Sequence, residues 1–338
     1  MVHAVFSHAF RVVRAALAVT GVVAVALFAM LTVPLTSPPE LISVTRAARA
    51  VDHSDLPEVD RFLARDGTTL GYRHYPAHAP AAPRVAVLVH GSSGSSNGSI
   101  HALARALASA GVETFAPDIR GHGTSGTRGD IGYPGQLEDD MADLLGEVER
   151  VRPGVPVTLI GHSAGGGFAL RVAATAVGNR FERTVMIAPY LGWDAPTNRP
   201  DSGGWARADV PRVMALMVLG RLGFHGADAL PALAFAVPAD AAPRLRTPRY
   251  SYRLMRNFAT GDFRADIAAA RTPLALFAGS DDEMMLSDRY QDAVGATVPV
   301  RVIAGVNHIA VVSAPEAVAV IAADVATWRG AAVSANTN

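Results

Sequence analysis

The sequence contains neither cysteine nor lysine in its 338 residues. Without cysteine the chain can form no disulfide, use no thiol nucleophile and bind no metal through thiolates. All 30 basic residues are therefore arginine, and 30 acidic residues balance them to a formal net charge of zero. Because there is no basic run, the sequence lacks the electrostatic footprint of a nucleic-acid-binding protein, and we expect no nucleic-acid partner.

Hydrophobic residues make up 50% of the chain. This fraction supports a sizeable core and argues against global disorder. The length leaves room for one large α/β domain with an insertion, or for two domains.

Residues 1–36 form the one strongly biased segment. Arg11 and Arg14 precede a stretch, residues 15–33, that is apolar on every face. As a helix this stretch would rise about 28 Å, close to the ~30 Å of bilayer hydrocarbon. That length favours an uncleaved membrane anchor, since the apolar region of a signal peptide usually has roughly 7–15 residues. The arginines place the N-terminus in the cytoplasm and the rest of the chain outside; secretion after signal cleavage is the alternative.

The remainder predicts a linker at residues 37–57, a folded domain at residues 58–330 and a disordered tail at residues 331–338. Within the domain, a hairpin signal spans residues 61–75. Apolar runs predict strands, and amphipathic stretches predict helices, in regular alternation. The strands are predicted at residues 84–90, 112–116, 155–160, 183–188, 273–278 and 298–303, and the helices at 99–110, 136–151, 164–176 and 315–328. This alternation predicts a mainly parallel sheet with helices on both faces, and an active site beyond the carboxyl ends of the strands.

Residues 191–263 interrupt the alternation. They are rich in proline, arginine, methionine and aromatic residues, and residues 210–222 have helical character. We interpret this segment as a helical cap inserted over the strand ends.

Gly161, Ser163 and Gly165 fit the pattern G-x-S-x-G between a strand-like and a helix-like stretch. A serine on such a sharp turn has a strained backbone, and the two glycines remove Cβ atoms that would clash there. The motif predicts a nucleophile elbow with Ser163 as the nucleophile. A glycine-rich phosphate-binding turn is the structural alternative.

A serine hydroxyl needs a base within hydrogen-bond reach. Of the 11 histidines, His308 stands where the last predicted strand ends and is the predicted base. A carboxylate should orient its imidazole. Asp281, Asp282 and Glu283 follow the penultimate strand, and the residues alone do not separate them; Asp194 is a fourth candidate.

An oxyanion hole needs two backbone N–H groups, one of them from the residue after the nucleophile, here Ala164. The second is expected from the loop at residues 90–94, where we assign it to Ser92. A flexible glycine–serine surface turn is the alternative interpretation of this loop.

Five segments follow one another in an order that resembles a known family. They are HGSSG at residues 90–94, DIRGHGTSG at 118–126, GHSAGG at 161–166, GSDDE at 279–283 and GVNH at 305–308. Together they resemble the monoacylglycerol lipase, lysophospholipase and S33-type group of α/β-hydrolases. The resemblance covers residues 61–328 and is weakest through the cap. It implies the α/β-hydrolase fold.

The resemblance also implies roles for single residues. In that group the acid lies three residues after the strand-end glycine, which here selects Asp282 after Gly279. The second oxyanion donor follows the His-Gly pair, which again gives Ser92. Residues 118–122 match a segment that is usually structural in the group, so His122 is not assigned a catalytic role.

These observations predict a serine hydrolase that cleaves carboxylic esters of acylglycerol or lysophospholipid type. Ser163, His308 and Asp282 would form its triad, an acyl-enzyme its intermediate, and neither a metal nor an organic cofactor is required. Methionines such as Met284 suit an acyl-chain pocket but fit a cap core equally well. One alternative is an S33-type peptidase or amidase, which needs a group that anchors a substrate amine. The other is a non-catalytic, membrane-tethered binding protein on a hydrolase scaffold.

Overall fold

A computed structural model describes residues 2–78, 83–238 and 246–330. The tail predicted at residues 331–338 lies outside them. An eight-stranded sheet has the order β1-β2-β4-β3-β5-β6-β10-β11. Only the β1–β2 and β2–β4 pairs are antiparallel, which confirms the predicted, mainly parallel sheet. The strands are β1 (Val59–Leu63), β2 (Thr69–Tyr75), β3 (Val85–Val89), β4 (Glu113–Pro117), β5 (Val157–His162), β6 (Arg183–Ile187), β10 (Leu274–Gly279) and β11 (Val300–Ile303).

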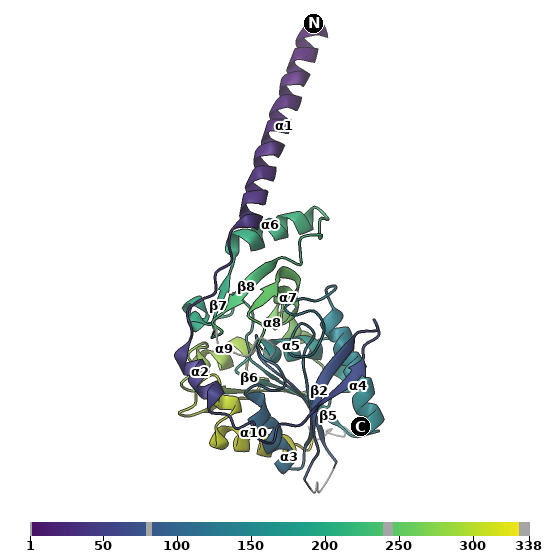
Figure 1. Ribbon diagram of the computed structural model, residues 1–338, viewed down its shortest axis with the longest axis vertical. Coiled ribbons are helices and arrows are strands. Elements are labelled where there is room, and N and C mark those ends of the chain that lie inside the picture. Colours follow the sequence, from purple (N-terminus) through teal and green to yellow (C-terminus); the bar gives the residue numbers. More distant parts are fainter. Residues whose placement is uncertain (1, 79–82, 239–245, 331–338) are drawn as a thin grey trace, which may run out of the picture.

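Helices cover both faces of the sheet (Figure 1). One face carries α4 (Gln136–Val151) and α5 (Ala164–Ala173), and the other carries α3 (Ile100–Ser109) and α10 (Pro315–Thr327). Successive side chains of β3 alternate between these two cores, as the period of a strand requires. Val85, Val87 and Val89 pack toward α4 and α5, and Ala86 and Leu88 pack toward α3 and α10. Burial on both faces explains why this strand is a continuous apolar run.

The insertion between β6 and β10 is a mixed α/β cap. The sequence predicted a helical cap, and the helices are there, but the cap also contains a three-stranded antiparallel sheet, β7-β8-β9. Its elements are β7 (Ala206–Ala208), α6 (Val210–Arg221), β8 (Pro231–Phe235), β9 (Arg249–Ser251), α7 (Tyr252–Asn257) and α8 (Phe263–Ala269). Helix α9 (Tyr290–Val294) follows β10. Within the described chain, four short helical turns lie at Gly178–Arg180, Pro200–Gly204, Ser287–Arg289 and Ala310–Val312.

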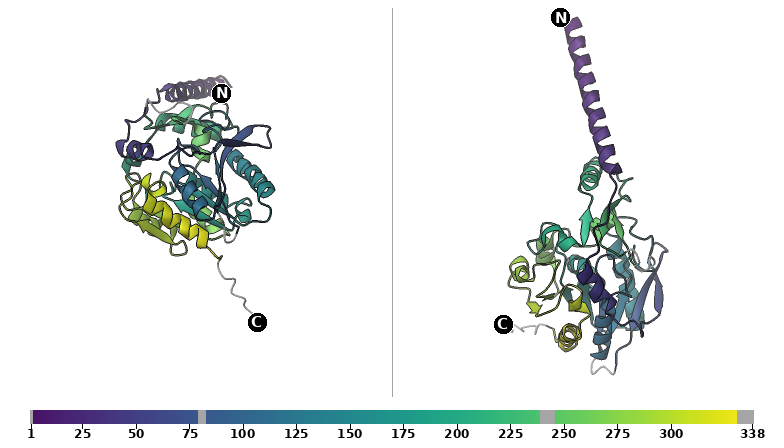
Figure 2. Two further views of the ribbon diagram at one scale, coloured as in Figure 1. Left: turned by 60° about the horizontal axis from the view of Figure 1, so that its bottom comes forward. Right: turned by 60° about the vertical axis from the view of Figure 1, so that its left-hand side comes forward.

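The N-terminal helix α1 (Val2–Thr32) extends away from the folded domain (Figure 1 and Figure 2). Its segment Phe10–Thr32 is long and apolar enough to cross a membrane, with a mean hydropathy of 2.3 and 0% of its most apolar window buried. A signal sequence at an N-terminus would have the same properties. The foot of α1 is fixed to the cap, because the Arg212 guanidinium donates hydrogen bonds to the carbonyls of Leu31 and Val33.

The segment at residues 37–57, predicted as a linker, contains a short helix, α2 (Ile42–Arg49). Val44 and Thr45 of this helix are buried against the folded domain. The segment is therefore part of the packed structure and reaches the site described next.

Candidate active site

Ser163 occupies a sharp turn between β5 and α5. Its backbone has φ 56° and ψ −122°, a combination that costs free energy for a residue with a Cβ atom. A Cβ on Gly161 would lie 2.1 Å from the carbonyl oxygen of Gly165, and one on Gly165 would lie 2.3 Å from that of His90. Both contacts are with backbone atoms, so only glycine fits at either position. The sequence motif therefore produces the geometry expected of a nucleophile elbow.

Strained backbone conformations occur at the carboxyl ends of the inner strands. Within the described residues, three that are not glycine have positive φ: Ser93, Ser163 and Ala188. They follow β3, β5 and β6, which are adjacent in the sheet. Strain held in place by neighbouring structure at the carboxyl ends of parallel strands is typical of functional sites.

The side chains of His308 and Asp282 form a hydrogen-bonded pair. The Nδ1–H of His308 donates to Oδ2 of Asp282 at 2.7 Å, and both side chains are buried. The other carboxylate oxygen of Asp282 accepts the backbone N–H groups of Met284 and Met285, each at 2.8 Å. Asp282 is thereby held in one orientation and fixes the tautomer of His308. Nε2 of the imidazole has no hydrogen-bond partner among the described residues, although it is buried.

The other three candidates for the triad acid have different surroundings. Asp281 is exposed and accepts a hydrogen bond from Ser280. Glu283 accepts the backbone N–H of His308 at 3.0 Å, so it holds the histidine loop and not the imidazole. Asp194 is exposed. Of the four, Asp282 is the one whose carboxylate contacts the ring of His308.

Charges in this cluster shift two pKa values in opposite directions. Burial alone would raise the pKa of Asp282, but the charge and hydrogen bond of His308 and two backbone N–H groups outweigh it and lower that pKa. Burial alone would lower the pKa of His308, and the Asp282 carboxylate outweighs it and raises that pKa. Each group thus stabilises the charged form of the other.

A second histidine, His162, supports the loop of His308. Its Nε2–H donates to the backbone carbonyl of His308 at 2.9 Å. Burial and the nearby His308 lower the pKa of His162 to about 3, so this imidazole is neutral and works as a fixed donor. No sequence signal indicated this role, since His162 lies at the variable position of G-x-S-x-G.

Ser92 and Ala164 provide two backbone N–H groups next to Ser163. Ala164 begins α5, where the first N–H groups of a helix lack intrahelical acceptors. Neither N–H takes part in a hydrogen bond within the part of the chain that the structure describes. Both groups are therefore free to donate to a ligand, as an oxyanion hole requires.

The cap holds the loop that carries Ser92. The indole N–H of Trp205 donates to Oγ of Ser92 at 2.9 Å, and the hydroxyl of Tyr250 accepts the N–H of Ser93 at 2.6 Å. That hydroxyl also lies 2.5 Å from Nε2 of His122. His122 is buried, with its pKa held well below the ordinary value, so it is neutral and accepts the proton of Tyr250. These contacts give His122 the structural role that the resemblance implied.

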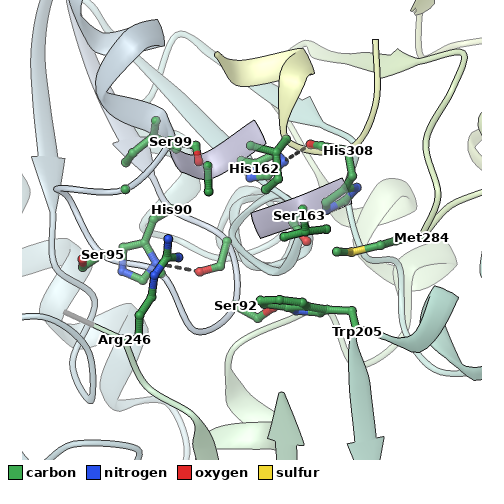
Figure 3. A pocket seen from close by; sticks show the side chains of 17 residues that line it. His90, Ser92, Ser95, Ser99, His162, Ser163, Trp205, Arg246, Met284 and His308 are labelled. Atoms are coloured by element: carbon green, nitrogen blue, oxygen red, sulfur yellow. Dashed lines mark hydrogen bonds between the residues drawn. The ribbon is translucent and has the colours of Figure 1, made fainter. Parts of the chain in front are cut away.

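Ser163, His308 and Ser92 line one narrow pocket beneath the cap (Figure 3). Its free volume is about 50 Å³, well below the roughly 300–1,000 Å³ of typical ligand pockets. The space over the serine is thus too small for a ligand of ordinary size. Helix α2 contributes Val44 and Ala48 to the wall, a contribution that the sequence analysis did not predict.

A mainly parallel sheet in this strand order, with a strained serine turn after β5 and a cap over the strand ends, defines a protein of the α/β-hydrolase class. The chain belongs to the serine aminopeptidase S33 family, whose sequence profile it matches over residues 80–309. The resemblance drawn from the five sequence segments is confirmed by this match.

Known relatives agree with that assignment. The chain is 31% identical to human monoglyceride lipase over 156 residues, which are 45% of this chain and 49% of that protein. It is 32% identical to the monoacylglycerol lipase of Mycolicibacterium smegmatis over 108 residues, 32% of this chain and 38% of that protein. The chain thus spans about half the length of the curated relatives it matches, or less.

Among solved structures, a soluble variant of Saccharomyces cerevisiae monoglyceride lipase superposes with a TM-score of 0.61 at 16% identity. The match covers 81% of this chain and 94% of that one. A likeness at this identity shows a shared fold.

Proposed function

We propose that the protein is a serine hydrolase that cleaves carboxylic esters, with Ser163, His308 and Asp282 as its catalytic triad. The observation that carries the proposal is the convergence of a strained serine, an imidazole with an unpartnered Nε2 and a buried carboxylate on its Nδ1 at one pocket. Such a site performs nucleophilic acyl transfer without a metal or an organic cofactor.

In the proposed reaction, Oγ of Ser163 attacks the ester carbonyl and passes its proton to Nε2 of His308. Asp282 stabilises the imidazolium that forms, and the N–H groups of Ser92 and Ala164 hold the oxyanion. Each such donor contributes roughly 3 kcal/mol in comparable sites. His308 then protonates the departing alcohol, and a water molecule, activated by the same histidine, hydrolyses the acyl-enzyme and restores the serine.

Substrates of acylglycerol or lysophospholipid type fit the site best. The pocket has apolar lining residues from three segments of the chain: Ile100 on α3, Met284 after β10 and Ile309 next to His308. The two relatives compared above are a monoglyceride lipase and a monoacylglycerol lipase, which supports a lipid-derived ester. Because the free volume is only about 50 Å³, the pocket must widen to admit an acyl chain, and a shift of the cap would do this.

We further propose that α1 anchors the protein and that the cap faces the bilayer. Helix α6 lies across the foot of α1 (Figure 1). Several of its apolar side chains, and Phe224 just after it, are exposed to solvent: Val210, Met214, Met217, Val218, Leu222 and Phe224. Arg11 and Arg14 at the other end of the span favour a cytoplasmic N-terminus and a catalytic domain outside the cytoplasm. The alternative is a cleaved signal and a secreted domain.

A peptidase or amidase is the second candidate function, because the matching family is described as a serine aminopeptidase family. A peptidase that takes a free amino terminus needs an acid facing the substrate. Among the described residues that line the pocket there is no aspartate or glutamate. The lining therefore favours the esterase over an aminopeptidase.

The experiment is hydrolysis of p-nitrophenyl esters, from acetate to palmitate, by the full chain in neutral detergent. The full chain is needed because removing residues 1–50 would take away the pocket wall made by α2. We expect hydrolysis and labelling by a fluorophosphonate, both lost in Ser163→Ala and both kept in Ser109→Ala, whose serine lies on the surface of α3. A wild-type protein that is inert to all esters and to the label would refute the proposal, and cleavage of aminoacyl amides alone would favour the peptidase.

A further inference from the structure

Among the described residues that line the pocket, one side chain is permanently charged, and the proposed reaction does not use it. Arg246 lines the pocket together with Ser163, and no acid lines it within the described chain. The backbone around Arg246 is fixed: its carbonyl accepts a hydrogen bond from Arg128 at 2.9 Å, and the next residue, Thr247, donates to the carbonyl of Ser93 at 3.1 Å. The backbone from which the Arg246 side chain extends is therefore held beside the proposed oxyanion loop.

Arg246 has no carboxylate partner among the described residues. Other arginines packed into the domain do have one: Arg120 pairs with Asp140, Arg183 with Asp324 and Arg253 with Asp130. The side chain of Arg246 is mostly buried, and burial lowers its pKa. A guanidinium nevertheless does not lose its proton in proteins, so the charge stays and its lost hydration costs free energy.

The neighbours of Arg246 do not compensate this charge. His90 beside it is neutral, because its Nε2 accepts the N–H of Ile119 at 3.2 Å and its Nδ1 donates to the carbonyl of Gly91 at 2.8 Å. Burial lowers the pKa of His90 and outweighs the hydrogen bond to Gly91 and the charge of Asp118, which raise it; the charge of Arg246 also lowers it. Oγ of Ser92 accepts the indole proton of Trp205, which leaves its own proton available to a ligand. Among the described residues that line this end of the pocket, the guanidinium is the one charged group and no carboxylate opposes it.

The arrangement also separates the two ends of the site. In the view of Figure 3, Arg246 and His90 lie on one side of Ser92 and Ser163, and His308 and Met284 lie on the other. A ligand bound over the serine could therefore place an ionic group at Arg246 without disturbing the Asp282–His308 pair.

We propose that Arg246 is an anion-binding residue of this site, and that the substrate is an ester that also carries a carboxylate or a phosphate group. A guanidinium suits either group, because it can donate two parallel hydrogen bonds to their oxygens. The proposal rests on the esterase function and deepens it: of the two substrate types, it favours the lysophospholipid-like ester over a neutral acylglycerol.

The test compares matched neutral and anionic esters with the full chain in neutral detergent. One pair is 1-butyrylglycerol and its 3-phosphate; the other is p-nitrophenyl butyrate and mono-p-nitrophenyl glutarate. We expect a higher kcat/KM for the anionic member of at least one pair. Arg246→Gln should lower kcat/KM for that anionic ester by about tenfold to a hundredfold, the effect of losing one charge-assisted contact, and change the neutral ester by less than about threefold. Arg246→Lys should keep part of the preference for the anionic ester. Arg249→Gln, at an exposed position, should keep all of that preference.

The two pairs identify the source of the anion. A preference for the phosphate ester alone supports a headgroup-like anion on the alcohol, and a preference for the glutarate alone supports an anion on the acyl side. Equal kcat/KM values within both pairs for the wild type would overturn the proposal while leaving the esterase intact. So would an Arg246→Gln variant that loses activity equally on neutral and anionic esters.

A binding measurement separates this proposal from the proposed function. Ser163→Ala in the full chain should bind 1-O-butylglycerol 3-phosphate, which has no ester to hydrolyse, and Ser163→Ala/Arg246→Gln should bind it about tenfold or more weakly. That result would support the anion site even if no ester were cleaved. Equal affinity of the two variants would overturn the anion site even if esters were cleaved.

Discussion

Replacing Tyr250 by phenylalanine would test how the cap controls the proposed oxyanion loop. The hydroxyl of Tyr250 accepts the N–H of Ser93 and donates to His122, and all three residues are buried. Phenylalanine keeps the ring but leaves two buried polar groups without partners. An unsatisfied buried group costs about 1–3 kcal/mol, so we expect the free energy of unfolding to fall by about 2–4 kcal/mol.

The same change should affect catalysis, because Ser93 is the neighbour of Ser92. Removing an oxyanion donor outright costs roughly a hundredfold to a thousandfold in kcat. Tyr250→Phe only loosens the loop that carries the donor, so we expect a smaller loss, about tenfold. The loss should fall on kcat with little change in KM, because the oxyanion contact forms in the transition state.

Urea denaturation and steady-state hydrolysis of p-nitrophenyl butyrate measure the two effects. Tyr72→Phe is the matched control: its hydroxyl donates to Glu147 of α4 at 3.1 Å, and the pair is only partly buried. In the control we expect the free energy of unfolding to fall by less than about 1 kcal/mol and the activity to stay unchanged. Were Tyr250→Phe to match wild type in both kcat and unfolding free energy, the cap would not hold the loop as argued.

Three further predictions concern the proposed triad and its turn. Asp282→Asn should lower kcat about ten-thousandfold, since an amide no longer fixes the tautomer of His308; a loss below about tenfold in steady-state assays would exclude Asp282 as the triad acid. His308 accepts a proton only when neutral, and its pKa is raised above the ordinary 6.5. The kcat/KM should therefore fall as pH drops through that raised value, and the acidic limb should move to lower pH in Asp282→Asn; a wild-type limb below 6.5 would contradict the raised pKa. Gly161→Ala should unfold at lower temperature and lose activity, because its Cβ would lie 2.1 Å from the carbonyl oxygen of Gly165. Gly146→Ala, where nothing lies within 4 Å, should instead stabilise α4 by about 0.5–1 kcal/mol; equal melting temperatures for the two variants would show that the elbow tolerates a Cβ.

Most of the sheet and its helices could be predicted from the sequence, because local pattern determines them. The run at residues 84–90 is apolar at every position since β3 is buried on both faces, and the amphipathic stretch at residues 136–151 coincides with α4. The sharp turn at Ser163 could also be predicted from the sequence. The clashes that require Gly161 and Gly165 involve atoms close in sequence or on an adjacent strand, so the motif carries the geometry with it.

The acid could not be chosen from residue types alone. Asp281, Asp282 and Glu283 are consecutive, and on a tight loop consecutive side chains point in different directions. The resemblance selected Asp282. In the structure Asp281 is exposed, Asp282 contacts the imidazole of His308, and Glu283 accepts the backbone N–H of His308. That choice depends on the path of the loop after β10.

The cap sheet escaped prediction for a related reason. Strands β7 and β9 contain three residues each, too few for an alternating pattern to be read. Their pairing through β8 joins segments that are separated in the sequence, and only the folded chain brings them together.

What the sequence by itself determined, then, is the class of fold and the place of the proposed nucleophile and its proposed base at the strand ends. Tertiary structure alone decided which side chains enclose that chemistry. Trp205, Tyr250 and Arg246 come from the cap and Val44 from the segment after the membrane-length helix, and none carries a local signal. Their roles depend on packing between segments distant in the chain, which hydrophobic pattern and turn propensity do not encode.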